Sequence, residues 1–275
     1  MKKLMIVDSH AIAHTAKHRT KGYHKNGSET GIIHGFLERV LSTINIIKPD
    51  NIVFSWDNRN SKRRKIYPKY KIERVELRKT DEYELHKMAM KQFNILREEI
   101  IPAFGFVNSF SFDGYEADDI AGKIVRNNVE YKIVLVTRDS DWYQLLGANT
   151  KLWNISSMRY YTQKNLLEDH GMTTDEFVMA KALSYVKGIQ LATARKFLHN
   201  DLKEESKAYK SIELDWLAVN TTYFDLCYLP FDNCPDINIE EWSGLDIDSI
   251  EKILNKYSFQ DMSADEWAHV LPAPF

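Results

Sequence analysis

The sequence predicts an α/β fold with a mostly parallel central sheet flanked by helices. Short apolar runs that end at or just before an aspartate occur at residues 4–7, 52–56 and 133–137. Unbroken apolar runs of this length are typical of strands buried on both faces of a parallel sheet. Helical patterns lie between them, at about 31–47, 81–101 and 116–127. Strands that alternate with helices indicate an α/β domain, which we assign to residues 1–171.

The segment at about 59–80 departs from this alternation because it is strongly basic and has few large apolar residues to bury. Its cationic side chains, interleaved with Tyr67 and Tyr70, are Arg59, Lys62, Arg63, Arg64, Lys65, Lys69, Lys71, Arg74, Arg78 and Lys79. We therefore predict a basic excursion from the core. A local cluster of positive charge in a chain whose net charge is only −2 indicates an anionic partner at this segment.

The remaining residues, 172–275, are predicted to form a second, mostly helical region with an acidic tail. A short helical pair is expected at 175–198 and another helix near 246–257. Cys227 and Cys234 match no zinc pattern and no disulfide scaffold, which favours free thiols in a reducing cytosol. The N-terminal apolar run is too short for export, and no run approaches the length of a membrane span. We therefore expect a cytoplasmic protein with no membrane partner.

Clustered carboxylates give the strongest chemical signal. The acids that follow strands or open a helix are Asp8, Asp57, Glu116, Asp118, Asp119, Asp139 and Asp141. A single aspartate after a strand is more often a cap or turn residue. However, the carboxyl ends of parallel strands meet at one rim of the sheet, so acids from successive strand ends are expected to converge. Magnesium prefers such oxygen ligands, and two ions roughly 4 Å apart can activate water and stabilise the leaving oxygen in phosphodiester hydrolysis.

Two other chemistries fit the N-terminal block less well. His10, His14 and His18 are spaced by four and would share a helix face near Asp8, which is a spacing that can bind zinc. The glutamate of an HExxH motif is absent, so a helix surface or groove role is the more common explanation. An aspartate-dependent phosphatase would need a second aspartate two residues after Asp8, where His10 stands.

In their order along the chain, these acidic blocks resemble the flap-endonuclease/5′-exonuclease family. This family includes phage 5′ nucleases, phage RNase H-type enzymes and the 5′-nuclease domain of bacterial DNA polymerase I. The resemblance covers about residues 1–200. It implies a PIN-like 5′ nuclease core and a magnesium- or manganese-dependent 5′→3′ exonuclease or flap endonuclease. The expected partners are branched or 5′-ended DNA, with RNA/DNA hybrids and replication proteins as further partners of a monomer.

The resemblance also implies roles for individual residues. Asp8, Asp57, Glu116 and Asp118 resemble ligands of a first metal ion with Asp119 close by, and Asp139 and Asp141 resemble ligands of a second. The basic segment resembles the helical arch through which a single-stranded 5′ end passes. Within it, Lys71 and Arg74 belong to a Tyr-Lys-x-x-Arg element whose cations approach the scissile phosphate, so we expect them to stabilise transition-state charge. The residues expected to bind nucleic acid are Lys17, Arg59, Lys62, Arg63, Arg64, Lys69, Tyr70, Gly188, Thr193 and Lys196.

The sequence departs from the family pattern near residue 188. The stretch 188–196 resembles a Gly-Ile-Gly-Pro-Lys-Thr-Ala hairpin that grips duplex DNA, often with a potassium ion, but Gln190 replaces the second glycine and would be strained if the turn needs a positive φ. The preceding Gly-Asp-x-x-Asp-Asn-Ile segment, which carries two second-metal aspartates, is absent. We therefore expect two ions with the second held weakly, and a weaker grip on the duplex. The alternative is a protein that binds branched DNA with weak or lost cleavage.

Overall fold

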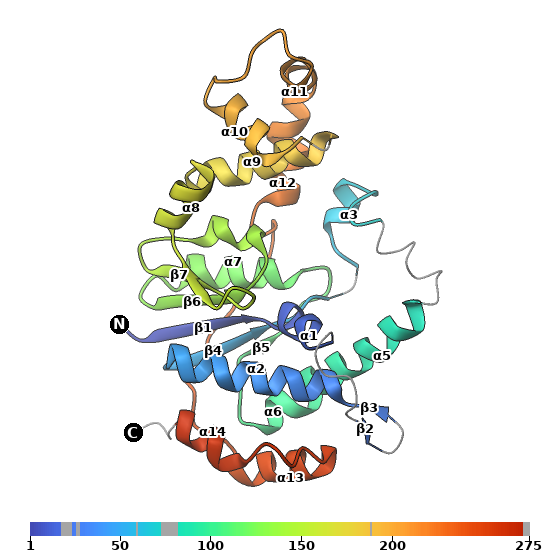
Figure 1. Ribbon diagram of the computed structural model, residues 1–275, viewed down its shortest axis with the longest axis vertical. Coiled ribbons are helices and arrows are strands. Elements are labelled where there is room, and N and C mark those ends of the chain that lie inside the picture. Colours follow the sequence, from blue (N-terminus) through green and yellow to red (C-terminus); the bar gives the residue numbers. More distant parts are fainter. Residues whose placement is uncertain (18–23, 26–27, 59, 73–81, 188, 272–275) are drawn as a thin grey trace.

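The computed structural model describes residues 1–17, 24–25, 28–58, 60–72, 82–187 and 189–271, and it confirms the predicted α/β class (Figure 1). A six-stranded sheet has the order β5-β4-β1-β6-β7-β8. Its strands are β1 Lys3–Asp8, β4 Asn51–Ser55, β5 Ser109–Phe110, β6 Lys132–Thr137, β7 Thr150–Asn154 and β8 Arg159–Tyr161. All neighbouring strands are parallel except β7 and β8. A separate two-stranded hairpin consists of β2 His24–Lys25 and β3 Ser28–Glu29.

The central strand β1 explains why both faces of the sheet are covered. Its Met5 and Val7 pack into one apolar cluster, and its Leu4 and Ile6 pack into another on the opposite face. This alternation follows from the two-residue period of a strand. The helices are α1 Ser9–Lys17, α2 Gly31–Ile47, α3 Arg63–Ile66, α5 Glu82–Ile95, α6 Ile101–Ala103, α7 Ala117–Asn127, α8 Gln163–His170, α9 Thr174–Lys187, α10 Leu191–Leu198, α11 Lys207–Ala218, α12 Phe224–Cys227, α13 Ile247–Tyr257 and α14 Ala264–Val270. Three shorter helical turns are the π-helical Leu96–Ile100 and Val219–Tyr223 and the 3₁₀ turn Ser140–Leu145.

The predicted second region, 172–275, divides between the two faces of the sheet. Helices α9 to α12 belong to the cluster around Leu4 and Ile6, on the face that α7 covers. Helices α13 and α14 lie at the opposite end of the molecule and pack on the face that α2 and α6 cover (Figure 1). There the fully buried Trp267 contacts Phe104, with ring centroids 5.1 Å apart. The last two helices therefore pack in the core cluster that contains Met5 and Val7.

The basic excursion leaves the core after β4, and only part of it is described. Helix α3 and a turn run to residue 72, whereas 59 and 73–81 lie outside the described residues. The expected arch thus stays a prediction for most of its length. Within the described part of the chain, the structure contains no helix with the length and apolar character needed to cross a bilayer.

Candidate active site

The carboxyl ends of three adjacent strands bring the predicted acids to one rim. Asp8 ends β1, which lies between β4 and β6, while Asp57 and Asp139 each follow the end of their strand by two residues. The N-terminus of α7 reaches the same place, because the backbone N–H of Ala117 donates to Asp57 Oδ1 at 2.8 Å. This contact places Glu116, the N-cap of α7, beside the strand ends. The predicted convergence of these blocks is therefore found in the fold.

A threonine hydroxyl links the acids of the two central strands. Thr137 Oγ1 donates to Asp8 Oδ2 at 2.6 Å and accepts from the backbone N–H of Asp139 at 3.0 Å. The other oxygen of Asp8 accepts from Ala11 N–H at 2.9 Å. Burial raises the pKa of Asp8 to about 7, and the charges of Asp57 and Asp139 add to this rise. Burial thus favours the protonated form of Asp8, and a nearby cation would favour the ionised form.

Asp118 lies within the electrostatic influence of the carboxylates of Asp8, Asp57 and Glu116. Its Oδ1 accepts from the indole N–H of Trp142 at 2.8 Å. Burial raises the pKa of Asp118 well above its ordinary value; the carboxylates of Asp57, Glu116 and Asp8 contribute to the rise and Lys71 opposes it. Several carboxylates within electrostatic reach of one another repel, and a bound cation relieves that repulsion.

Lys71 brings positive charge to the rim from the basic excursion. Its Nζ lies 3.0 Å from both carboxylate oxygens of Glu116, and the adjacent Tyr70 hydroxyl donates to Glu116 Oε2 at 2.9 Å. Lys71 has a φ of 50°, a left-handed conformation that is uncommon for a residue other than glycine. The ion pair with Glu116 places this ammonium at the acidic rim, and the role predicted for Lys71 in catalysis stays a prediction. The ring of Tyr70 is buried and stacks on Tyr185, so it is not available to stack on a base in this conformation.

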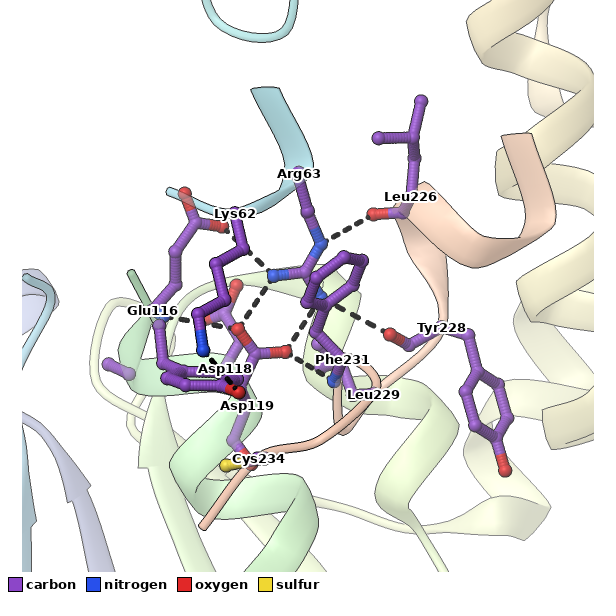
Figure 2. Close-up of polar contacts among 12 residues, drawn as sticks. Lys62, Arg63, Glu116, Asp118, Asp119, Leu226, Tyr228, Leu229, Phe231 and Cys234 are labelled. Carbon is purple, nitrogen blue, oxygen red and sulfur yellow. Dashed lines mark hydrogen bonds and ion pairs between the residues drawn. The ribbon is translucent and has the colours of Figure 1, made fainter. Parts of the chain in front are cut away.

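Arg63 and Asp119 form a buried pair rather than the contacts predicted for them (Figure 2). The two guanidinium Nη atoms lie 2.6 and 2.7 Å from the two oxygens of Asp119. Arg63 Nε also donates to the carbonyl of Leu226 at 2.9 Å. Asp119 further accepts from the backbone N–H groups of Phe231 and Glu116. Both side chains are almost fully buried, at 1% and 0% exposure, so Arg63 cannot reach a nucleic acid and Asp119 is fully engaged as a structural acceptor.

Asp141 is paired with a lysine that the sequence did not single out. Lys181, in the middle of α9, places its Nζ 2.6 Å from Asp141 Oδ1. Asp141 N–H donates to Asp139 Oδ1 at 2.9 Å, which joins the two acids. Burial raises the pKa of Asp139, and the charge of Asp141 adds to this rise whereas Lys181 and Lys71 oppose it. The far end of the rim therefore already contains a cation.

The other predicted nucleic-acid contacts are distributed over the excursion and the helical pair. Lys62 donates to the Tyr115 hydroxyl at 2.8 Å, Arg64 Nε donates to the carbonyl of Tyr70, and Lys69 is exposed. Lys196 is exposed on α10 and Thr193 is half-buried. Arg59, Arg74 and Gly188 lie outside the described residues, as does the side chain of Lys17 at the end of α1.

Gln190 does not carry the strain that the hairpin comparison predicted. Its φ is −65° and its ψ is 145°, an ordinary extended conformation at the N-cap of α10. The chain thus enters α10 at Gln190 without a left-handed backbone conformation.

The histidines of α1 are used for packing and positioning. The rings of His10 and His14 pack edge-on against Phe93, with centroids 5.1 and 5.0 Å away. His10 Nδ1 accepts from the backbone N–H of Asp57 at 3.1 Å, which helps to hold that acid at the rim. The structure therefore favours the packing explanation of these histidines, and His18 lies outside the described residues.

The rim fits a cation in its chemistry but is not closed around one. In the ranges that the structure describes, no three His, Cys, Asp or Glu side chains are grouped so that they could hold a metal ion as they stand. The acids near Asp118 nevertheless form a set of oxygen donors that a divalent ion would stabilise, and two of them, Asp8 and Asp118, have raised pKa values. Lys71 is paired with Glu116 in this arrangement, so Glu116 could act as a ligand only after that ion pair opens.

Five positioning residues were not expected from the sequence. They are His10, Thr137, Trp142, Tyr185 and Lys181, and each contacts a predicted site residue. Thr137 ends a predicted strand directly before the acidic block, so its place gave some signal. The others come from helices whose contacts with the rim depend on the tertiary fold.

A parallel sheet that gathers carboxylates at its carboxyl rim, beside a lysine from a basic segment, defines a nuclease-type hydrolase. The chain belongs to the 5′-3′ exonuclease family, because residues 3–171 match the model of its N-terminal resolvase-like domain. The predicted family is thereby confirmed.

Similar proteins and structures agree with this family. The chain is 30% identical over 214 residues to DNA polymerase I of Caldicellulosiruptor bescii, an alignment that covers 71% of this chain and 24% of the polymerase. It is 27% identical over 189 residues to a 5′-3′ exonuclease of Buchnera aphidicola, covering 66% of this chain and 62% of that protein. The chain thus spans about a quarter or less of the length of the polymerases that it matches.

Two solved structures show that the fold is shared. The bacteriophage T5 D15 protein, co-crystallized with metal ions, has a TM-score of 0.70 and 19% identity, with 98% of this chain and 99% of that chain covered. Human GEN1 in complex with Holliday junction DNA has a TM-score of 0.58 and 15% identity, with coverages of 98% and 71%. At these identities the likeness concerns the fold, and it confirms the PIN-like core.

Proposed function

We propose that this member of the 5′-3′ exonuclease family hydrolyses phosphodiester bonds in branched or 5′-ended DNA with magnesium or manganese as its cofactor. The observation that carries the proposal is the group of Asp8, Asp57, Glu116 and Asp118 at one rim, with the ammonium of Lys71 3.0 Å from Glu116. Metal ions and DNA in the structural relatives support the same choice of cofactor and substrate.

The four acids are the residues that would hold a divalent ion. When bound there, the ion supplies charge stabilisation for the phosphate and makes a coordinated water more acidic. Thr137, His10 and Trp142 keep the acids Asp8, Asp57 and Asp118 in place through their hydrogen bonds. Fixed donors of this kind reduce the reorganisation needed when substrate binds.

Lys71 has the position to meet the scissile phosphate. Its ammonium can transfer from the carboxylate of Glu116 to a phosphate oxygen, since both are anionic acceptors of charge-assisted hydrogen bonds. That exchange would release Glu116 to the ion at the moment when DNA arrives. Arg74 has a similar role in this proposal, and the cations of Lys62, Arg64 and Lys69 guide the DNA backbone towards the rim.

The exposed face of α10 contributes a second contact to the duplex. Lys196 and Thr193 lie on this helix, and a lysine that neutralises one phosphate adds sequence-independent affinity. RNA/DNA hybrids and the proteins of a replication complex are further partners in the proposal. Binding of branched DNA without efficient cleavage is the alternative, and the lysine beside Asp141 is the observation that favours it.

A labelled 5′-flap duplex tests the function directly. With magnesium or manganese, the wild-type chain should release short 5′ products, and Asp118→Asn should slow this by roughly a hundredfold because it removes charge while keeping the acceptor for Trp142. Asp248→Asn, an exposed aspartate of α13 at the other end of the molecule, is the matched control and should cut normally. Tight binding without products in either metal would support the alternative, and full activity of Asp118→Asn would refute the site.

A further inference from the structure

Lys181 lies beside Asp139 and Asp141, the acids that were predicted to bind a second metal ion. Its Nζ is 2.6 Å from Asp141 Oδ1, and its side chain is only 29% exposed although lysine heads usually lie in solvent. Its charge also acts on Asp139. The lysine thus serves both acids that were predicted to bind a second metal ion.

The surroundings of Lys181 fix it at this place. Gln144 donates to the backbone carbonyls of both Asp141 and Cys227, at 2.9 and 3.0 Å, and so ties the turn after β6 to α12. Helix α9 packs in the same apolar cluster as these segments. The ammonium therefore projects into a corner whose walls are cross-linked by hydrogen bonds.

Helix α9 brings a cation to this corner and no described carboxylate. The acids of α9 are Asp175 and Glu176 in its first turn. Glu176 is engaged elsewhere, because it accepts from Thr173 N–H at 2.7 Å and lies 3.2 Å from His199 Nε2. Asp141 already contacts an ammonium, and Asp139 lies within the electrostatic influence of the same charge. The two acids therefore offer a divalent ion less net negative charge, and the ammonium repels that ion.

We propose that the Lys181 ammonium is the resident cation of the Asp139 and Asp141 side, so that the chain binds one divalent ion instead of two. This inference rests on the proposed function, since it concerns the same rim. A tethered ammonium neutralises charge but cannot coordinate and acidify a water as a metal ion does. All chemistry that needs a divalent ion is then assigned to the side of Asp8, Asp57, Glu116 and Asp118.

Titration of the full chain with manganese alone tests the proposal, with calorimetry and the electron paramagnetic resonance signal of free Mn²⁺ as readouts. The wild type should bind one ion. Lys181→Met keeps the aliphatic stem and removes the charge, so a second ion should bind about ten- to a hundredfold more tightly than it does to the wild type. Lys181→Arg keeps the positive charge and should still bind one ion.

A matched lysine controls for the loss of any paired charge. Lys123 on α7 has a side chain that is 24% exposed and lies 2.8 Å from Asp236, away from the acidic rim. Lys123→Met should bind one ion like the wild type. Lys181→Gln provides a second uncharged variant, read in the same way if Lys181→Met does not fold.

The outcomes separate this inference from the proposed function. The inference would be overturned if the wild type bound two ions, or if both uncharged Lys181 variants bound one ion. Flap cutting by the wild type would in that case still support the proposed function. Absence of any bound ion in the wild type would overturn both. Two ions bound only by the uncharged Lys181 variants is the supporting result.

Discussion

The buried pair of Arg63 and Asp119 makes a prediction that separates a structural acid from a metal ligand. In Asp119→Asn the arginine keeps its charge in a site where it is 1% exposed. It also loses one of the two ionic contacts, at 2.6 and 2.7 Å, because the amide presents a donor where a carboxylate oxygen stood. Removing one partner of a buried ion pair destabilises a protein by about 3–5 kcal/mol.

Urea unfolding without metal, followed by tryptophan fluorescence, measures this loss. With a dependence of roughly 3 kcal/mol per molar urea, the midpoint should fall by roughly 1–1.7 M. The neighbouring substitution Asp118→Asn is the control on the same helix. It removes a buried charge that the other acids repel, so the free energy of unfolding should stay unchanged or rise.

The opposite pattern would refute this assignment of roles. If Asp119→Asn left the free energy of unfolding within about 1 kcal/mol of the wild type and weakened manganese binding more than Asp118→Asn did, Asp119 would be a ligand. Arg63→Met provides a check from the other partner. Its loss and that of Asp119→Asn should not add in the double variant, because each substitution breaks the same contact.

Three further predictions concern the rim and the helical pair. Lys71→Ala should reduce the single-turnover cutting rate by about 10²–10³-fold, yet strengthen manganese binding in calorimetry because Glu116 loses its competing cation; weaker binding would contradict this. The pKa of Asp8 is about 7 in the fold and lower in the unfolded chain, so its contribution to metal-free stability is present at low pH and lost as pH rises through 7. Over the same range manganese should bind more tightly and displace protons, which calorimetry at pH 6 in buffers of different ionisation enthalpy would detect; Asp8→Asn should release fewer protons than the wild type, because Asp118 also has a raised pKa. Lys196→Ala should weaken flap binding and reduce the slope of log affinity against log salt by about 1 in fluorescence anisotropy, and an unchanged slope would exclude a phosphate contact.

The sheet and its acidic rim could be predicted because the relevant signals are local. An apolar run followed by an aspartate specifies both a buried strand and the place where its acid appears, as at Asp8 and Asp57. Parallel pairing then brings such acids together without knowledge of side-chain contacts. The helix opened by Glu116 follows from the same kind of local pattern.

Long-range pairings could not be predicted from those signals. Arg63 stands among many cations of a basic run, and nothing local distinguishes the one that enters the core to meet Asp119. Lys181 lies in a helix whose sequence shows no link to Asp141, 40 residues earlier in the numbering. The packing of α14 on the core includes the contact of Trp267 with Phe104, which is likewise a property of the tertiary fold.

The packing of α13 and α14 on the core affects how helices α9–α12 are attached to the rest of the molecule. Helices α9–α12 follow the α/β core in the sequence, and α13 and α14 then pack on the opposite face of the sheet. The segment α9–α12 is therefore connected to the core at both of its ends. A segment anchored at both ends has fewer ways to move than one anchored at a single end. Lys181 of α9, which pairs with Asp141, and Leu226 of α12, whose carbonyl accepts from Arg63, both lie in this segment. Their alignment with the rim therefore depends in part on helices that pack on the opposite face of the sheet.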